Sequence, residues 1–378
     1  MYFKVFNLFF YMGIAALTYL NVYFKNVGLT SSQIGFINSV AKGVSLVILP
    51  LWGMISDYYK ISKRLLIIAV LGAMLASLTF LLTDSFYMIM LVMSVFFIFW
   101  SPIIPLADAQ LLGYLGKNGN QYGKYRVWGS LGYTLLVPII GYLIEQTTAT
   151  NLFYYMGVIF FISLFTVRKL PTSNVTLEIA NVKDFKKLLK RGKLLKFILF
   201  IFFINLTLST NNIFFPLYVI DHGGGETLIG LALMIAAASE MFIFHYSDGI
   251  IERFDLKYIF LISALAFALR WFLLASFPIS MVFLGSQLLH SITFGLLHAV
   301  SVDFINLICG DKFKATGQNL YATTKGISSI VGSSIGGIIY GSLGGSILYF
   351  YLSLVALVTG LIYFTFLNSR DKVVAVEN

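Results

Sequence analysis

Long apolar runs separated by short polar segments make up most of the chain. About twenty apolar residues cross the hydrocarbon core of a bilayer as an α-helix. Runs of this length predict twelve transmembrane helices, with short connections everywhere except at residues 168–194. The predicted spans are 3–24, 34–56, 65–83, 86–107, 127–145, 151–167, 195–220, 228–250, 257–276, 279–308, 319–343 and 346–367. The pattern therefore predicts an all-α membrane protein.

Composition excludes a soluble domain. Of the 378 residues 58% are hydrophobic and 11% are charged, whereas a soluble domain carries roughly 25% charged residues. The single cysteine, Cys309, excludes an intrachain disulfide and a cysteine-based metal cluster. The first apolar run is too long for the core of a cleavable signal peptide, so we interpret it as the first span.

Basic residues mark one side of the membrane. If both termini are cytoplasmic, all but four of the 26 Lys and Arg residues fall in cytoplasmic segments. The exceptions are Lys25 on the outer side, and Lys42, Arg270 and Lys325 inside predicted spans. This asymmetry follows the positive-inside rule and predicts a multi-pass protein of the inner (plasma) membrane with cytoplasmic termini. Nucleic acid is not expected as a partner, because a nucleic-acid binder gathers its basic residues on one folded face.

The central loop carries its basic residues on an amphipathic stretch, 182–190. Such a stretch is typical of a helix that lies on the anionic inner leaflet. A regulatory binding role is the alternative, and a plain linker is favoured over it.

An internal repeat relates the two halves of the chain. Tyr, Gly and Ile-Gly recur at a fixed offset of 195 residues, close to half the chain. The matching positions are Tyr23 and Tyr218, Gly28 and Gly223, Ile34 and Ile229, and Gly35 and Gly230. Duplicated six-helix halves are typical of transporters that rock around a site at the midplane of the membrane. The prediction is two pseudo-symmetric bundles, 1–167 and 195–378 with a short cytoplasmic tail, joined by a cytoplasmic basic linker, 168–194.

One loop resembles the motif of the major facilitator superfamily, a Gly followed four residues on by Asp and then by a basic cluster. The matching residues are Gly53, Asp57, Lys63 and Arg64. A carboxylate at a helix end can pair with a neighbouring helix N-terminus or an arginine and so hold one gate state. The resemblance implies the major facilitator fold and a gating role for these four residues.

Three further segments resemble the branch of that superfamily with lactose permease, nucleoside–proton symporters and the bacterial phenylpropionate permease. They are Ser101–Asp108, Tyr122–Gly132 and Gln287–Gly295. The resemblance implies that Asp108 and Arg126 bind substrate, and that Tyr133 replaces the tryptophan that stacks on the sugar. It also matches Glu240, Arg270, His290 and Lys325 to the buried acid, arginine, histidine and lysine of lactose permease. Two departures stand out: Thr293 replaces a carboxylate implicated in proton coupling, and span seven has no acid to partner Lys325.

The charged residues inside predicted spans are functional candidates on physical grounds, since each costs about 2.5–3.5 kcal/mol to insert. Arg270 and Lys325 lie too deep for their charges to reach the membrane surface easily. Lys42 lies on a helical face with Asn38 and Ser45, either lining a cavity or serving a structural role. Glu240 lies among alanines, where burial favours the neutral carboxyl form, so it is a candidate proton carrier. The alternative is a permanent ion pair with Arg270 or Lys325.

Asp108 and Arg126 lie near span ends, and apart from the resemblance they would be interpreted as an interfacial ion pair. Arg126 and Tyr133 share a helical face, which suits a planar or ring-shaped polar ligand. His290 could relay protons or bind substrate, and His298 is expected to be a packing residue.

The sequence has no phosphate-binding loop, metal-ligand spacing or nucleophile cluster, so no enzyme activity and no cofactor beyond a coupling proton are expected. We therefore predict a monomeric secondary transporter with the bilayer and a small-molecule substrate as its partners. It would import a small polar solute with protons by alternating access. A saccharide and an aromatic or other organic acid compete as substrate, with a nucleoside third. Proton-coupled efflux of drugs or lipids is the alternative. The surplus of deep positive charge favours an anionic solute.

Overall fold

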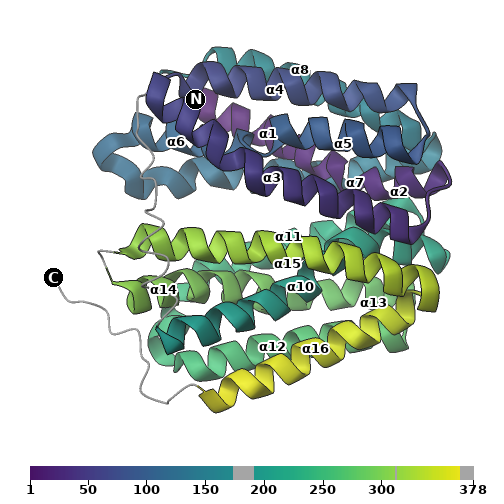
Figure 1. The fold of residues 1–378 in the computed structure, drawn as a ribbon, viewed down its shortest axis with the longest axis vertical. Coiled ribbons are helices and arrows are strands. Elements are labelled where there is room, and N and C mark those ends of the chain that lie inside the picture. The colour runs from purple at the N-terminus through teal and green to yellow at the C-terminus, as the bar shows by residue number, and fades with distance from the viewer. Residues whose placement is uncertain (173–190, 311–312, 367–378) are drawn as a thin grey trace. The chain divides into compact units, whose positions relative to one another are not determined.

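The computed structural model describes residues 1–172, 191–310 and 313–366, and in these ranges every regular element is helical (Figure 1). Twelve helical segments are long and apolar enough to cross a membrane, and they coincide with the twelve predicted spans to within a few residues at most ends. The helices are α1 (Tyr2–Leu17), α2 (Leu20–Asn26), α3 (Ser31–Tyr59), α4 (Ser62–Thr79), α5 (Phe86–Trp100), α6 (Ile103–Leu115), α7 (Tyr122–Gln146), α8 (Leu152–Arg168), α10 (Gly192–Asp221), α11 (Glu226–Arg253), α12 (Leu256–Ser276), α13 (Ser280–Gly285), α14 (Leu297–Cys309), α15 (Lys314–Leu343) and α16 (Gly345–Phe366). The amphipathic stretch 182–190 lies outside the described residues.

Three of the predicted spans are interrupted helices. The first breaks between α1 and α2, and the fourth breaks before Pro102. Pro102 has no N–H to continue the hydrogen-bond ladder, so a break there is expected. The tenth span passes from α13 through a short tight turn and a π-helical turn, Ser291–Leu296, into α14.

The chain divides into two compact units. The first holds α1 to α8 together with Gly223–Met234, and the second holds α10, α11 from Ile235 onward, and α12 to α16. Within the first unit α1 packs on α7, and α4 packs on α8. Within the second, α10 packs on α15, and α12 packs on α16 (Figure 1). These pairs are equivalent by the repeat, since each joins the first to the fifth span or the third to the sixth span of its half.

Two matching hydrogen bonds reproduce the repeat in three dimensions. The Tyr23 hydroxyl donates to the Phe80 carbonyl at 3.2 Å, and the Tyr218 hydroxyl donates to the Leu274 carbonyl at 2.8 Å. Each bond ties the first span of its half to the end of the third. Gly28 and Gly223 both take a positive φ, 90° and 77°, which only glycine adopts at little cost. The predicted pseudo-symmetry is confirmed.

Glycines set the close approach of helices inside each unit. On α15, a Cβ at Gly332 would lie 2.7 Å from the Thr210 hydroxyl and 2.9 Å from the Leu206 carbonyl, both of α10. The Thr210 hydroxyl uses this space to donate to the Gly332 carbonyl at 3.0 Å. In the first unit, a Cβ at Gly141 of α7 would meet the Glu226 carbonyl and the Tyr19 hydroxyl. The start of α11 is held there by Glu145, which accepts the Thr227 N–H at 2.8 Å, a favourable place for a carboxylate.

We expect Gly141→Leu to lower the free energy of unfolding by about 1–3 kcal/mol, because the added side chain has no room against α11. Thermal unfolding of the purified protein measures the effect. Gly123→Leu is the matched control, since Gly123 lies on the same helix with no atom within 4 Å of its Cβ position. Equal stability of the two variants would contradict the close contact at Gly141.

Candidate functional site

In the second unit, three of the predicted site residues form one hydrogen-bonded row. Glu240 Oε1 lies 2.6 Å from His290 Nε2, and Arg270 Nη1 lies 2.8 Å from His290 Nδ1. Glu240 comes from α11, Arg270 from α12, and His290 from the residue before the π-helical turn. The histidine stands between the acid and the arginine, so the row differs from a direct ion pair of Glu240 with Arg270 or Lys325. We call Glu240, His290 and Arg270 the relay.

The partners of His290 determine where its proton lies. A guanidinium can only donate hydrogen bonds, so Nδ1 of His290 must accept from Arg270. The ring proton is therefore on Nε2 and is donated to the Glu240 carboxylate; this tautomer is assigned from the hydrogen-bond partners. In this arrangement His290 is neutral, and it separates one negative charge from one positive charge.

Arg270 is buried at 1% exposure and is held by neutral partners besides His290. Its Nη2 donates to Gln287 Oε1, and its Nη1 lies 3.4 Å from the Thr293 hydroxyl. Thr293 is the position at which the family resemblance implies a carboxylate, so a neutral hydroxyl contacts Arg270 where a second acid would otherwise lie. Gln287 was not among the predicted site residues. Its spacing of three residues from His290, one helical turn, was the available signal.

Stacked rings extend from the relay toward α15. The rings of His290 and Phe294 lie 5.4 Å apart and nearly parallel, and those of Phe294 and His298 lie 5.6 Å apart. His298 Nδ1 lies 3.3 Å from the Tyr321 hydroxyl, which agrees with the expected packing role of His298. The π-helical turn falls within this stack, and such turns occur often at functional sites.

Lys325 lies on aromatic faces. Its ammonium is 5.7 Å from the ring centre of Phe294 and 5.2 Å from that of Tyr321. Among the residues that the structure describes, no carboxylate lies within ion-pair distance of it. Asn205, on span seven, instead donates to the Lys325 backbone carbonyl at 3.1 Å. A cavity of about 20 Å³ beside these residues is large enough for a single water molecule.

In the first unit, Arg126 and Asp108 have separate partners. The Arg126 guanidinium lies over the Tyr11 ring, 4.2 Å from its centre. The Asp108 carboxylate interacts with the Tyr122 hydroxyl. Asp108 and Arg126 do not form the interfacial ion pair that was the interpretation apart from the resemblance, and Tyr122 lies one helical turn before Arg126. Tyr133 is half-buried on the same helix.

Lys42 is half-buried on α3, with its ammonium 5.3 Å from the ring centre of Phe97. The residues of the polar stripe predicted for this helix, Asn38, Lys42 and Ser45, have different roles. Asn38 is buried and donates to Asn21 Oδ1 at 2.8 Å, so it joins α3 to α2. Of the stripe, Lys42 is the residue that presents a charge.

Of the four predicted gate residues, Gly53 and Asp57 lie toward the end of α3, and Lys63 and Arg64 lie at the start of α4. Lys63 donates to the Leu170 carbonyl at 2.5 Å, just after the C-terminus of α8, where a cation is electrostatically favoured. Asp57 is half-buried in the last turn of α3, and Arg64 is exposed. Gly53 has no atom within 4 Å of its Cβ position. The structure therefore assigns Lys63 to joining α4 and α8 within the first unit, and the gating role of the group remains a prediction.

Two kinds of contact recur among the candidate residues of the two units. The relay joins an acid to an arginine through a neutral histidine, and three cations (Lys42, Arg126 and Lys325) lie over aromatic rings. Within the described ranges, no group of three His, Cys, Asp or Glu side chains could hold a metal ion. The arrangement suits solute binding and proton exchange.

Buried charges inside two related six-helix bundles define a transporter of the major facilitator type. The chain matches the MFS_1 like family over residues 1–352, and it belongs to this family. It is a multi-pass membrane transporter and not an enzyme.

Its relatives include a permease and a probable transporter. The chain is 26% identical to a maltose permease of Geobacillus stearothermophilus, over 98% of this chain and 95% of that protein. It is 25% identical to a probable 3-phenylpropionic acid transporter of Escherichia coli K12, over 93% of each. A crystal structure of a variant of the nucleoside transporter NupG matches with a TM-score of 0.88 at 17% identity, covering 97% of this chain and 99% of that one. The likeness to NupG shows the fold alone.

We expect Arg270→Gln to destabilise the protein by about 3–5 kcal/mol, because it leaves the charge of Glu240 without its counterpart in a low-dielectric interior. Adding Glu240→Gln should recover part of that loss, since the double variant contains neither charge. Thermal unfolding of both single variants and the double variant gives the coupling free energy. Strictly additive effects would mean that the two charges do not interact through His290.

Proposed function

We propose that this protein is a proton-coupled symporter that imports an organic anion, best an aromatic carboxylate, by alternating access. The observation that carries the proposal is the neutral His290 held between Glu240 and Arg270. This arrangement has one place for an added proton, and filling that place changes the charge balance of the second unit.

The added proton goes to Glu240. A proton on His290 would turn Nδ1 into a donor facing the Arg270 guanidinium, which would put two donors and two positive charges against each other. A proton on the free lone pairs of the Glu240 carboxyl preserves both hydrogen bonds of His290. Glu240 is therefore the proton carrier, and Arg270 and His290 are positioning residues for it.

Protonation of Glu240 leaves the charge of Arg270 unbalanced. The remaining partners of Arg270, Gln287 and Thr293, are neutral. An unbalanced charge in a low-dielectric interior is costly, and an entering anion offsets that cost. Binding of the proton then strengthens binding of a carboxylate substrate, and binding of the substrate strengthens binding of the proton. The two together carry no net charge.

The three cations on aromatic rings favour the same class of solute. Each of Lys42, Arg126 and Lys325 has a ring as its described contact, and a carboxylate would be a stronger partner than a ring. Rings beside cations also suit a solute that combines a carboxylate with an aromatic group. In this proposal Lys42 and Arg126 of the first unit and Lys325 of the second are substrate-binding residues for the acid group, and Asp108, Tyr133 and His290 are further substrate-binding residues of their own units.

The relatives support two substrate classes. Similarity to a probable 3-phenylpropionic acid transporter favours the aromatic acid. Similarity to a maltose permease over nearly the whole chain favours a saccharide as the second candidate. A neutral sugar would leave the charge of Arg270 unbalanced after protonation, so the charge argument places it second. The proposed setting is the inner membrane, with a monomer whose termini are both cytoplasmic, as the distribution of basic residues predicts.

We expect Glu240→Gln to keep exchange of 3-phenylpropionate but to lose accumulation driven by a pH gradient. The amide oxygen can still accept the His290 Nε2–H, so the relay keeps its geometry and loses its proton site. Transport by proteoliposomes with and without an imposed pH gradient separates the two activities. Glu226→Gln, on the same helix but outside the relay, is the control and should accumulate solute as the wild type does. Uphill transport retained by Glu240→Gln would refute the assignment.

Substrate charge is tested with 3-phenylpropionate and its neutral amide. We expect Lys42→Gln to weaken binding of the acid by about tenfold and of the amide by less than about twofold, since the substitution removes a charge partner and little shape. Ligand-dependent thermal shifts of the purified protein give both affinities. Lys25→Gln, at the end of α2, controls for net charge. Equal binding of acid and amide to the wild type, together with binding of maltose, would favour the saccharide.

A further inference from the structure

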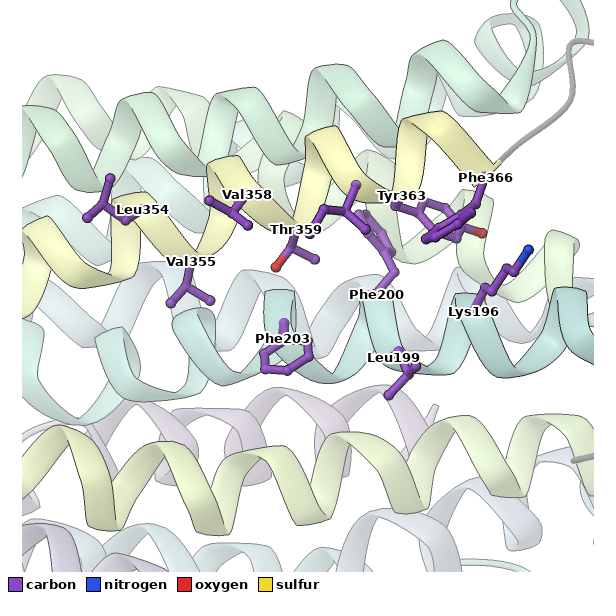
Figure 2. A pocket seen from close by; sticks show the side chains of 11 residues that line it. Lys196, Leu199, Phe200, Phe203, Leu354, Val355, Val358, Thr359, Tyr363 and Phe366 are labelled. Atoms are coloured by element: carbon purple, nitrogen blue, oxygen red, sulfur yellow. The ribbon is translucent and has the colours of Figure 1, made fainter.

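A long apolar groove runs between α10 and α16 of the second unit (Figure 2), and no relay residue lines it. Its volume is about 450 Å³. The lining comes from one face of each helix, with Leu199 and Phe203 on α10 and Val358 and Ile362 on α16. These side chains are 43–52% exposed in the folded chain, so the groove is open along its length. The stacked rings of Phe200 and Tyr363, 4.4 Å apart, lie deeper, where both residues are buried.

One end of the groove carries a positive charge. Figure 2 shows Lys196 and Phe366 together at one end and Leu354 at the other. The Lys196 ammonium lies 4.5 Å from the ring centre of Phe366. Of the residues that line the groove, Lys196 alone is charged. It lies in the second turn of α10.

The length of the groove matches one leaflet. From Leu354 to Phe366, α16 rises by about 18 Å at 1.5 Å per residue. Half of a bilayer hydrocarbon core is about 15 Å deep. A helix of a second copy of the chain would need an apolar face along the whole membrane depth. An acyl chain that starts at the membrane surface needs apolar contacts along only one leaflet, which is the length of the groove.

We propose that the groove is a binding site for an anionic phospholipid, with an acyl chain between α10 and α16 and the phosphate at Lys196. Lys196 is exposed and, in the described part of the chain, forms no ion pair. Two basic residues precede it along the chain, Lys193 and Arg191, and Arg191 Nη1 donates to the Ile308 carbonyl at 2.6 Å. Basic side chains near the membrane surface attract anionic headgroups. The apolar walls of the groove offer van der Waals contacts to an acyl chain. The site is independent of the transported solute and its coupling.

The test measures lipid adducts on the purified full-length protein by native mass spectrometry, during titration with dioleoylphosphatidylglycerol or dioleoylphosphatidylcholine. Wild type should bind the first phosphatidylglycerol about fivefold more tightly than phosphatidylcholine, the effect of one well-placed lysine. Lys196→Gln should abolish that preference and keep phosphatidylcholine binding. Val358→Trp should weaken both lipids, because the indole fills the groove.

Two matched variants make the outcome specific. Lys257 lies 4.1 Å from the ring centre of Phe364 and does not line the groove, so Lys257→Gln should keep the fivefold preference. Val158 on α8 is 61% exposed, so Val158→Trp should leave lipid binding unchanged. If Lys196→Gln and Lys257→Gln reduced the preference for phosphatidylglycerol equally, the proposal would be overturned in favour of attraction by diffuse surface charge. A wild-type dimer that Val358→Trp dissociates would overturn it in favour of a second copy of the chain.

Discussion

A guanidinium that cannot give up its charge, buried at 1% exposure in α12, constrains the second unit more than any other group. Arginine stays protonated at any pH the membrane protein meets. The charge of Arg270 must therefore be balanced by a negative charge, either in direct contact or at a distance. Here the negative charge is that of Glu240, and the neutral imidazole of His290 lies between the two. The tautomer of His290 follows from that one fixed charge, and the proposed place of the added proton and the proposed preference for an anion are argued from it.

The charges of Lys42, Lys325 and Arg126 also need stabilising contacts. Lys42, Arg126 and Lys325 lie over rings of Phe97, Tyr11 and the Phe294–Tyr321 pair. A ring face stabilises a cation by about 0.5–2 kcal/mol, less than a buried carboxylate can. Such cations are held in place without being neutralised. This is the condition expected of a site that must attract a charged solute and release it again.

Much of the fold could be predicted from the sequence because bilayer thickness fixes the length of apolar runs. The repeat was visible in Tyr23 and Tyr218, and the structure gives both hydroxyls equivalent carbonyl partners. The relay residues were also candidates from the sequence, Glu240 and Arg270 because buried charges are rare and conspicuous, and His290 through the family resemblance. The partner of each charge was not predictable. Asp108 interacts with Tyr122 and not with Arg126, and Arg270 uses Gln287, because several neutral side chains compete for each charge and only the packed geometry selects among them. The π-helical turn beside His290 has no signal in hydrophobic periodicity.

Infrared difference spectroscopy of the purified protein, between alkaline and acidic buffer, tests most directly whether the proton goes to Glu240. The account predicts a carboxylic-acid C=O band that grows on acidification and is missing in Glu240→Gln, while the imidazole bands of His290, identified by isotope-labelled histidine and a His290→Asn variant, keep their neutral pattern. Conversion of His290 to imidazolium, with the Glu240 carboxylate unchanged, would contradict it.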